Sequence, residues 1–323
     1  MSLKAVYTDT DDLDPAPGVR KLQEMGFEVI TLETHDPEVI ARDAADADAL
    51  LLGYAPISAQ TLKRMEKLQI VSLLATGYDN IDVAAATARG ICVANIGSTS
   101  AEEVATHALA LMLSLLRGIG TYKEVAGRRE WFKTPYPHVP PRLSELKLGL
   151  IGFGNIGRRL ATLANPLFRE IIFYDPQIPA GVTLNGALSL SLQEVLAESD
   201  VLSLHLPLTD QTHHLIDSAA FFKMKKGVYL INVSRGGLIN PTALEAALDS
   251  KIVLAAGLDV LETEPPTELD RIWLHPKVLI TPHVAFLSQY SIGAYIDVQS
   301  ENVVQWFSGK EVKYTINGIG IKK

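Results

Sequence analysis

The sequence predicts an α/β fold built from two doubly wound parallel sheets. Three observations support this prediction. Short strand-like runs alternate with amphipathic helical stretches, the runs fall into two separate series, and a glycine-rich turn opens the second series. The 323 residues are enough for two domains, each with its own hydrophobic core.

The first series fills the N-terminal third of the chain. Its strand-like runs are KAVYT, FEVIT, ADALLLG, QIVSLLA and GICVANI, separated by polar amphipathic stretches such as PGVRKLQEM. This alternation requires right-handed crossovers, which give an open parallel sheet with helices on both faces. The single cysteine, Cys92, lies in the last run and excludes an intrachain disulfide framework or a thiolate metal cluster. We therefore expect no metal centre.

The second series contains six runs: KLGLI, EIIFY, VLSLH, GVYLIN, VLAAGLD and KVLIT. Six is the strand number of a complete dinucleotide-binding sheet. After the first run, Gly152, Gly154 and Gly157 have the spacing G-x-G-x-x-G and lead into an amphipathic helix. In this pattern the first glycine allows a sharp turn, the second lets a pyrophosphate approach the backbone, and the third lets the helix pack close to the strand. A tight turn without a ligand is the alternative interpretation.

An acidic residue after the second of these runs favours the ligand-binding interpretation. Asp175 follows EIIFY, 18 residues beyond Gly157, where a carboxylate can accept hydrogen bonds from the adenosine ribose hydroxyls. A 2′-phosphate at that place would meet electrostatic repulsion, so we expect NAD rather than NADP. Arg158 and Arg159 could assist the phosphates, but solvated side chains in the first helical turn are the favoured interpretation.

A long apolar helix is predicted between the two series. In SAEEVATHALALMLSLLRG, Ser100 and Glu103 are expected to form a capping box and Gly118 to follow the helix end. The helix is apolar nearly all round and must be buried on several sides, either at a subunit interface or inside one chain. A final helical stretch, SIGAYIDVQSENVVQWFSG, has no further strand series to cover. We therefore expect it to return to the first domain.

The composition narrows the class of protein. No apolar run approaches the length of a membrane span, and the acidic start TDTDDLD is unlike a secretory or transit peptide, so a cytoplasmic protein is expected. The net charge is −8, from 29 basic and 37 acidic residues, and the basic residues are scattered. Nucleic acid is therefore not the expected partner, and a small molecule is.

Three candidate functional side chains follow three successive strand-like runs. Arg235 follows GVYLIN beside two glycines, Glu264 lies in VLETEPP after VLAAGLD, and His283 follows KVLI. Taken singly, each could be an ordinary surface or loop residue. The carboxyl ends of parallel strands share one edge of a sheet, so the three side chains are expected to lie close together. Arg235 would then bind an anion, Glu264 would supply a carboxylate, and His283 would carry a proton.

At this point the sequence resembles the D-isomer-specific 2-hydroxyacid dehydrogenase family over nearly its whole length. The matching pieces are ATGYDNID, GLIGFGNIG, YDP, HLPLT, NVSRGGLI, GLDVLETEP and TPHVA, in the family's order and spacing. The resemblance implies a Rossmann NAD-binding domain, residues 99–286, inserted into a flavodoxin-like substrate (lid) domain, residues 1–98 and 287–323. It also implies a homodimer formed through the region 100–118.

The resemblance assigns roles to individual residues. It implies that Arg235 binds the substrate, that Glu264 orients the histidine and that His283 is the acid/base. Substrate contacts are implied for Thr76, Gly77, Tyr78, Arg235 and Phe286. The implied cofactor contacts are Thr76, Gly152, Gly154, Asn155, Ile156, Gly157, Asp175, Leu206, Pro207, Thr212, Val233, Ser234, Asp259, His283 and Ala285. The implied reaction transfers hydride between the nicotinamide and C2 of a small 2-hydroxy or 2-oxo acid.

Within the family, GYDNID, the pair His213–His214 and Phe286 resemble the subgroup of the C-terminal binding proteins. This keeps a second interpretation open, an NAD(H)-sensing scaffold that binds peptide motifs. Two other enzyme classes are disfavoured. A formate dehydrogenase is expected to have glutamine where this sequence has Glu264, and an L-lactate-type enzyme is expected to have its glycine fingerprint near the N-terminus rather than at Gly152. His107, in the apolar helix, is expected to be a packed residue rather than a catalyst.

Overall fold

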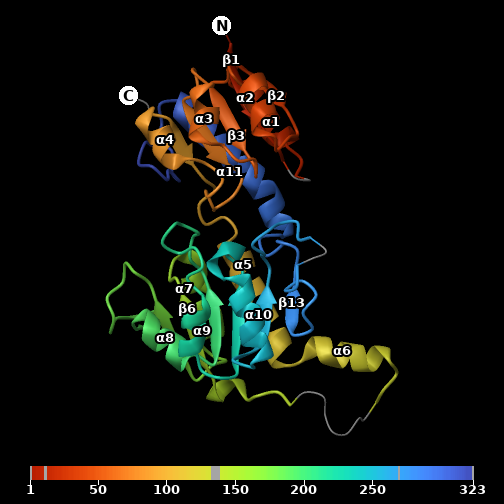
Figure 1. Ribbon diagram of the computed structural model, residues 1–323. Helices are drawn as coiled ribbons and strands as arrows, with labels where there is room; N and C mark the ends of the chain where they lie inside the picture. The colour runs from red at the N-terminus through yellow and green to blue at the C-terminus, as the bar shows by residue number, and fades with distance from the viewer. Residues whose placement is uncertain (1, 11–12, 132–138, 268–269, 322–323) are drawn as a thin grey trace. The chain divides into compact units, whose positions relative to one another are not determined.

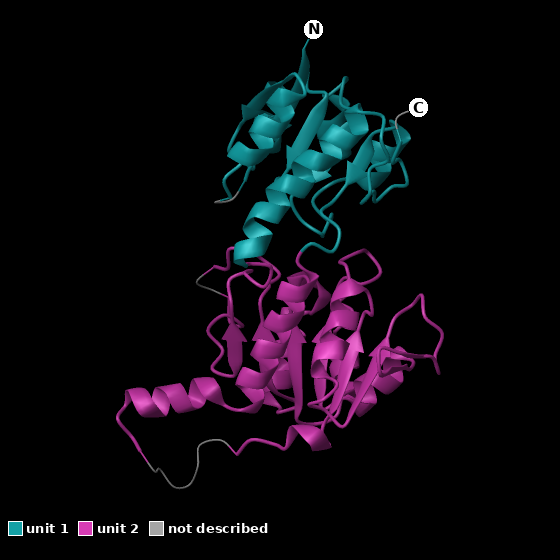
Figure 2. Ribbon diagram, turned by 180° about the vertical axis from the view of Figure 1, so that it is seen from behind, with its two compact units in different colours: residues 1–99, 288–323 teal, residues 100–287 magenta. Residues whose placement is uncertain are grey.

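The computed structural model describes residues 2–10, 13–131, 139–267 and 270–321. The chain divides into two compact units, unit 1 with Met1–Thr99 and Ser288–Lys323, and unit 2 with Ser100–Leu287 (Figure 2). Each unit contains one sheet with helices on both faces (Figure 1). The predicted α/β fold class is confirmed.

Unit 1 has five parallel strands in the order β2-β1-β3-β4-β5. This order is that of flavodoxin-like folds. The strands are β1 (Leu3–Tyr7), β2 (Phe27–Thr31), β3 (Ala49–Leu52), β4 (Ile70–Leu73) and β5 (Cys92–Ala94). Four of them lie within the predicted runs, and β1 begins one residue before the run KAVYT. The helices are α1 (Ala16–Glu24), α2 (Pro37–Asp43), α3 (Ala59–Lys63), α4 (Val83–Ala88) and α11 (Gln289–Phe307).

Strands β3, β4 and β5 of unit 1 are buried on both faces, because alternate residues belong to two different clusters, whereas the edge strand β2 is partly exposed. In β3, Ala49 and Leu51 belong to the cluster of α1 and α11, and Leu50 and Leu52 to the cluster of α2, α3 and α4. Such two-sided burial explains why the strands read as continuous apolar runs. Burial of the Cys92 thiol in β5 raises its pKa to about 12, so it is not a reactive thiolate.

Helix α11 is held in unit 1 by buried polar contacts as well as by packing. The Ser72 hydroxyl donates to the carbonyl of Gln299 at 2.8 Å, and the Gln299 side chain donates to the carbonyls of Ser72 (3.0 Å) and Leu52 (3.3 Å). The Asn302 amide donates to the carbonyl of Asn95 at 3.0 Å. Because buried polar groups need partners, these contacts fix the position of α11 along β3 and β4.

Unit 2 has eight strands in the order β13-β12-β11-β10-β6-β7-β9-β8. The strands are β6 (Lys147–Ile151), β7 (Glu170–Tyr174), β8 (Thr183–Leu184), β9 (Ala187–Ser189), β10 (Val201–Leu204), β11 (Val228–Asn232), β12 (Val253–Leu258) and β13 (Val278–Ile280). The helices are α5 (Ala101–Leu116), α6 (Ile119–Gly127), α7 (Asn155–Ala164), α8 (Leu192–Glu198), α9 (Ser218–Lys223) and α10 (Pro241–Asp249), with short 3-10 helices η1 (Leu143–Glu145) and η2 (Gly236–Leu238). Helices α5 and α7 pack in one core cluster, and α8, α9 and α10 in the other.

The count of six strands in the second series was wrong, because β8 and β9 were missed. β9 pairs parallel to β7 and is the third strand of the dinucleotide-binding order, so KVLIT, as β13, is an additional strand at the edge. β8 and β9 form an antiparallel hairpin whose turn residues, Asn185 and Gly186, have φ of +51° and +77°. An Asn-Gly pair is the strongest short-range hairpin signal, and it was present in TLNGALS.

Helix α5 is buried on several sides, as its apolar sequence predicts. Its buried residues are Val104, Ala105, Ala108, Leu111, Met112 and Leu116, and Gly118 follows the helix with φ of +63°. The predicted capping box was wrong, because the Ser100 side chain makes no capping hydrogen bond. Ser100 has φ of −109° and ψ of +22°, outside the extended conformation in which a cap oxygen faces the first turn.

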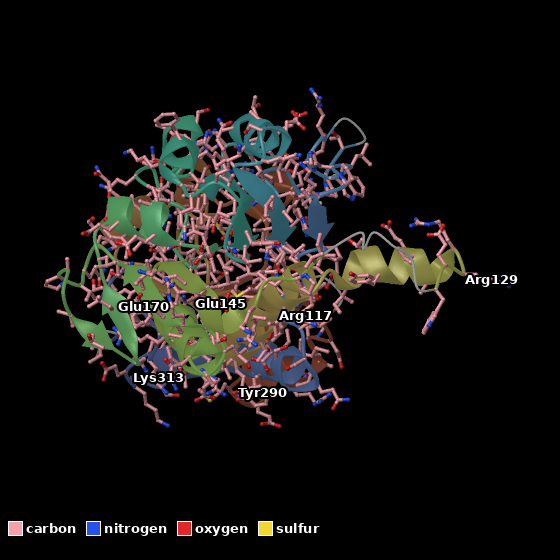
Figure 3. All side chains as sticks on the ribbon, turned by 90° about the horizontal axis from the view of Figure 1, so that it is seen from below. Arg117, Arg129, Glu145, Glu170, Tyr290 and Lys313 are labelled. Atoms are coloured by element: carbon pink, nitrogen blue, oxygen red, sulfur yellow. The ribbon has the colours of Figure 1, made fainter. Side chains whose placement is uncertain are left out.

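Helix α6 extends away from the sheet of unit 2 and carries Arg129 beyond its far end (Figure 3). Among the described residues no single helix has both the length and the hydropathy needed to cross a membrane. Helices α5 and α6 together meet both requirements, but the chain bends by 59° between them.

Candidate active site

The glycine-rich turn lies between β6 and α7, at the point where the strand order of unit 2 reverses. β6 is flanked by β7 on one side and by β10 on the other, and ligands bind in such sheets at this switch point. Gly152 has φ of +94°, and a Cβ there would lie 2.4 Å from the carbonyl oxygen of His205, at the end of β10. A Cβ on Gly157 would lie 2.5 Å from the carbonyl oxygen of Gly152. These two glycines therefore serve the turn and the close packing of α7.

Gly154 is different, because a Cβ there would meet no protein atom within 4 Å. It precedes Asn155 and Ile156 at the start of α7, where the backbone N–H groups have no intrahelical partner. The open space and the N–H groups fit a pyrophosphate, which the positive end of the helix dipole would also favour. The turn thus has the features that a dinucleotide requires.

These glycines give a matched pair of substitutions. We expect Gly154→Ala to leave the thermal midpoint of unfolding nearly unchanged and to weaken NADH binding by about 1–3 kcal/mol, because the methyl group would occupy the space of the pyrophosphate. Gly152→Ala should instead lower the midpoint, because its φ and the His205 carbonyl both exclude a Cβ. Differential scanning fluorimetry and NADH fluorescence titration measure both effects. Unchanged NADH affinity in Gly154→Ala would contradict this assignment.

Asp175, at the end of β7, fixes the glycine-rich turn. Its carboxylate accepts hydrogen bonds from the backbone N–H of Phe153 (2.8 Å) and of Gln177 (2.9 Å), and the residue is half-buried. The arginines at the start of α7 are also engaged within unit 2. Arg158 donates to the carbonyl of Phe153 at 2.9 Å, and Arg159 pairs with Glu102 at 3.0 Å. These contacts differ from the expectation that both side chains are only solvated.

The loop after β10 contains the predicted cofactor residues Leu206, Pro207 and Thr212. Leu206 is buried, Pro207 is exposed, and the Thr212 hydroxyl closes the loop by donating to the carbonyl of Pro207 at 2.7 Å. In the same region, burial lowers the pKa of His205 to about 3. His205 is therefore neutral and is not a competing acid/base candidate.

The segment after β11 presents Arg235. Buried Asn232 shapes this segment, since its side chain accepts from the N–H of Ser234 (3.0 Å) and donates to the carbonyl of Arg235 (2.9 Å). Val233 is buried, and the Ser234 hydroxyl donates to the carbonyl of Leu204 in β10 at 2.8 Å. Sequence reasoning missed Asn232, although an asparagine that ends an apolar strand was a visible signal.

Glu264 and His283 form a hydrogen-bonded pair. His283 Nδ1 lies 2.6 Å from Glu264 Oε2, and Glu264 Oε1 accepts from the N–H of Leu261 at 2.7 Å. His283 has φ of +52°, a conformation that a non-glycine residue keeps only where the surroundings enforce it. The segment of Arg235 lies against the loop of Glu264, because a Cβ on the next residue, Gly236, would lie 2.0 Å from the carbonyl oxygen of Leu261. The Arg235 charge also lowers the pKa of the Glu264 carboxyl, so unit 2 brings the segments of the three predicted residues together.

The groups around Glu264 shift the pKa of its carboxyl. Burial, the largest influence, would raise it, but the hydrogen bond and charge of His283, the Leu261 N–H and the charge of Arg235 hold the pKa below its usual 4.5. The carboxylate is therefore ionised at neutral pH and accepts the proton on His283 Nδ1. This leaves Nε2 as the nitrogen through which the ring can exchange a proton with a ligand.

The depressed pKa predicts a pH-dependent stability difference. Because the folded-state pKa of Glu264 lies below the unfolded value, its ionised form stabilises the fold above about pH 4.5, and this contribution is lost as the pH falls through the folded-state pKa. We therefore expect Glu264→Gln to reduce the free energy of unfolding near neutral pH, and the difference from the parent to shrink on acidification. Urea unfolding across this pH range measures it, and a pH-independent difference would contradict the prediction.

Asp259 holds the loop that carries His283. It is 1% exposed, and its carboxylate accepts from the Thr281 hydroxyl (2.5 Å), the Val284 N–H (3.0 Å) and the Ala285 N–H (2.8 Å). Its own carbonyl accepts from the His283 N–H at 2.8 Å. These bonds give Asp259 a positioning role, and its predicted contact with a cofactor stays a prediction, as does that of Ala285.

His107, on α5, extends this network. Its Nε2 lies 2.9 Å from the Thr281 hydroxyl and 3.5 Å from Asp259 Oδ1. Because the single hydroxyl proton of Thr281 is used on Asp259, His107 is the donor to Thr281. It is therefore a packed residue with a specific partner. Sequence reasoning missed Thr281, which stands two positions before His283 in TPH.

The remaining predicted substrate residues lie in different places. Phe286 is half-buried and packs against the core cluster of α5 and α7 in unit 2. Thr76, Gly77 and Tyr78 follow β4 in unit 1, where the Thr76 hydroxyl donates to the carbonyl of Gly97 at 2.9 Å and Tyr78 packs against the core. The substrate roles of these four residues stay predictions.

Unit 2 thus has the fold and the turn of a nicotinamide dinucleotide-binding domain, and it carries an arginine beside a Glu–His pair at strand ends. These features define the class of NAD-dependent oxidoreductases that act on an anionic substrate.

Comparison with known proteins identifies the family. Residues 109–285 match the D-isomer specific 2-hydroxyacid dehydrogenase, NAD binding domain. The chain belongs to the D-isomer-specific 2-hydroxyacid dehydrogenase family. Glycerate dehydrogenase of Methylorubrum extorquens is 32% identical over 321 residues, which are 96% of this chain and 98% of that protein. Hydroxypyruvate reductase of Blautia hydrogenotrophica is 31% identical over 320 residues, again 96% and 98%.

Solved structures agree with this assignment. D-lactate dehydrogenase from Aquifex aeolicus, complexed with NAD and lactic acid, has a TM-score of 0.89 with 27% identity and covers 97% of this chain and 99% of its own. An NADPH-dependent glyoxylate/hydroxypyruvate reductase from Sinorhizobium meliloti has a TM-score of 0.88 with 26% identity, and the match covers 100% of this chain and 99% of that one. The protein is an NAD-dependent oxidoreductase that transfers hydride between nicotinamide and a small 2-hydroxy or 2-oxo acid.

Proposed function

We propose that the physiological substrate is a short, polar 2-oxo acid of the hydroxypyruvate and glyoxylate type, and that hydroxypyruvate is reduced to the D-2-hydroxy acid. The observation that carries the chemistry is the Glu264–His283 pair beside Arg235. Support for the substrate comes from the full-length relatives, named glycerate dehydrogenase and hydroxypyruvate reductase.

Each of the three residues has a distinct part in this proposal. Arg235 binds the substrate carboxylate and the neighbouring carbonyl through its guanidinium fork, which orients C2 and stabilises negative charge developing on the carbonyl oxygen. Protonated His283 donates its Nε2 proton to that oxygen. Glu264, which is ionised, accepts the proton on Nδ1 and so keeps the ring of His283 oriented.

The cofactor would be held by the turn at Gly154 and by Asp175, with further contacts from the loop 206–212 and from Val233 and Ser234. When bound, NADH supplies the hydride that reduces C2 of the substrate. The Asp175 carboxylate favours NADH over NADPH, since a 2′-phosphate beside it would be repelled. Thr76, Gly77, Tyr78 and Phe286 are proposed to complete the substrate contacts.

A substrate panel tests the proposal. Glyoxylate, hydroxypyruvate, pyruvate and a branched 2-oxo acid are each assayed by NADH oxidation, in parallel with NADPH, and the product is analysed for chirality. We expect the highest kcat/KM with hydroxypyruvate or glyoxylate, with NADH, and a D product from hydroxypyruvate. A preference for the branched acid would overturn the proposed substrate class. An L product from hydroxypyruvate would overturn the proposed stereochemistry.

We also propose that the protein is a cytoplasmic homodimer that associates through the region 100–118, together with the adjoining start of α6. Leu109 and Leu113 on α5 are only half-buried, and Ile119, which begins α6, is 57% exposed. Apolar surface of this kind is typical of subunit interfaces. Analytical ultracentrifugation of the parent should give a dimer, and Ile119→Glu should shift it toward the monomer. A monomeric parent would refute the proposed assembly.

A second candidate function is the NAD(H)-sensing scaffold of the C-terminal binding protein subgroup. GYDNID, His213–His214 and Phe286 favour it. The intact Arg235, Glu264 and His283 set favours the enzyme, because a scaffold needs none of the three. Peptide binding without turnover of any 2-oxo acid would favour the scaffold.

A further inference from the structure

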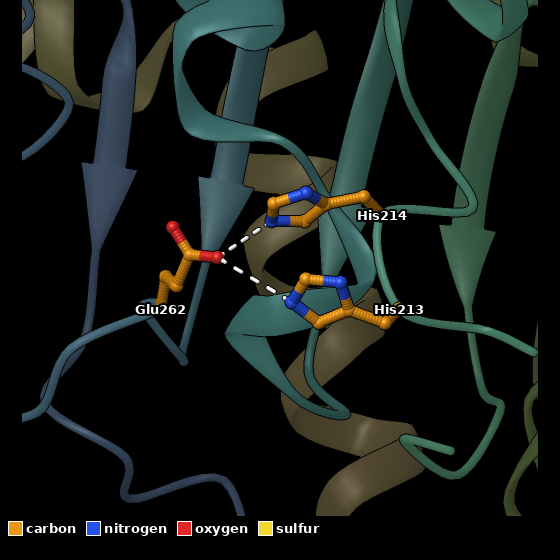
Figure 4. Close-up of side chains that lie close together, drawn as sticks. All are labelled: His213, His214 and Glu262. Carbon is orange, nitrogen blue, oxygen red and sulfur yellow. Dashed lines mark hydrogen bonds and ion pairs between the residues drawn. The ribbon is translucent and has the colours of Figure 1, made fainter. Parts of the chain in front are cut away.

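We propose that His213, His214 and Glu262 form a zinc-binding site on the surface of unit 2, outside the predicted active-site set. The three side chains point toward one another from two loops, the one after β10 and the one after β12 (Figure 4). Their ligand atoms all lie within 4.8 Å of one another. The cysteine count had argued against a metal site, but this donor set contains no sulfur.

The donor set suits zinc. Two imidazole nitrogens and one carboxylate oxygen are a recurrent protein ligand set for Zn²⁺, with water in the fourth position. Glu262 Oε1 lies 2.6 Å from His214 Nε2 and 3.8 Å from His213 Nε2. Tetrahedral ligands about 2.1 Å from zinc are roughly 3.4 Å apart, so each donor needs to move by less than about 1 Å.

The surroundings keep the cluster both assembled and accessible. His214 has φ of +51°, and its N–H donates to the carbonyl of Gly237 at 2.8 Å, so its backbone is held in a sparsely populated conformation. Conformations of this kind cluster at binding and catalytic sites. The side chains of His213 and Glu262 are 54% and 37% exposed, so an ion can reach them from solution. The rings of His213 and His214 stack with centroids 3.9 Å apart.

Asn240 provides the sharpest test of the site, because it faces the other nitrogen of His214. Asn240 Nδ2 lies 3.3 Å from His214 Nδ1, and Asn240 Oδ1 caps α10 by accepting from the Ala243 N–H at 2.9 Å. Zinc on Nε2 requires a proton on Nδ1, which an amide donor opposes and a carboxylate would accept. Aspartate caps helices as well as asparagine does, so Asn240→Asp should keep the fold and improve metal binding.

The experiment is a calorimetric titration with Zn²⁺. The full chain is first freed of metal by chelation. We expect one saturable site in the parent, its loss in His213→Gln and Glu262→Gln, and an affinity about tenfold higher in Asn240→Asp. His275→Gln, a histidine outside the cluster, is the matched control and should bind as the parent does. Cobalt(II) gives a second readout, since intense visible absorption bands indicate tetrahedral coordination.

The outcomes separate clearly. No saturable heat in either the parent or Asn240→Asp would overturn the proposal. Binding that survives in both His213→Gln and Glu262→Gln would also overturn it, because the ion would then be held by other residues. These measurements do not use catalysis, so their failure leaves the proposed substrate unaffected, and failure of the substrate panel leaves the zinc site unaffected.

Discussion

Replacing His283 by alanine should lower kcat for 2-oxo acid reduction by about 10²- to 10⁴-fold, the range that a positioned proton donor contributes. NADH affinity should change little, because the glycine-rich turn and Asp175 lie on other strands of unit 2. Steady-state kinetics with hydroxypyruvate and a fluorescence titration with NADH separate the two effects. The loss should appear in kcat, since proton transfer occurs in the transition state.

The control for this prediction is His275→Gln. His275 precedes β13 at the amino end of the strand, whereas His283 follows the carboxyl end, and its Nδ1 accepts from the N–H of Lys277 at 3.2 Å. This variant should retain the parent's kcat. If His283→Ala kept full turnover, or if both variants lost it equally, His283 would not be the proton donor.

Arg235→Lys should be the second severe substitution, although it keeps the positive charge. A lysine ammonium is a single point donor and cannot reproduce the two parallel hydrogen bonds of a guanidinium to a carboxylate. Loss of one charge-assisted hydrogen bond costs about 1.5–3 kcal/mol, which is roughly a 10- to 150-fold loss of kcat/KM. Kinetics over a range of hydroxypyruvate concentrations measure this loss.

Arg271→Lys is the matched control for Arg235. Arg271 pairs with Glu245 at 2.6 Å and has a side chain that is 79% exposed, so lysine can replace it. An Arg235→Lys variant with the parent's kcat/KM would show that the fork does not grip the substrate. Equal losses in the two variants would point to a general effect of arginine replacement.

The sequence predicted the sheets well because buried parallel strands leave a simple signal. Each of the eleven predicted apolar runs coincides or overlaps with a strand, since a strand covered on both faces is built mainly from apolar residues. β8 and β9 escaped because they are only two and three residues long and lie partly at the surface. The Ser100 cap failed for another reason. Its sequence pattern was right, but the backbone conformation that decides a cap cannot be read from residue types.

The candidate site was predictable to the level of strand ends and no further. Because parallel strands end at one edge, Arg235, Glu264 and His283 could be expected to meet from their sequence positions. Which atoms pair depends on loop conformation, such as the left-handed backbone of His283 and the contacts of Asp259 and Thr281. These backbone conformations and hydrogen bonds depend on contacts between segments far apart in the sequence, so they cannot be predicted from the local residue pattern.

The split of unit 1 along the chain has a consequence for biosynthesis. On the ribosome, the five strands of its sheet emerge before unit 2, but helix α11, which supplies Gln299 and Asn302 to β3 and β4, emerges after unit 2. Until then the polar groups around Ser72 lack their native partners, and the sheet lacks one of the helices that cover it. Unit 2 is continuous and can fold co-translationally as soon as it is released, which makes the N-terminal portion a natural client for chaperones during translation.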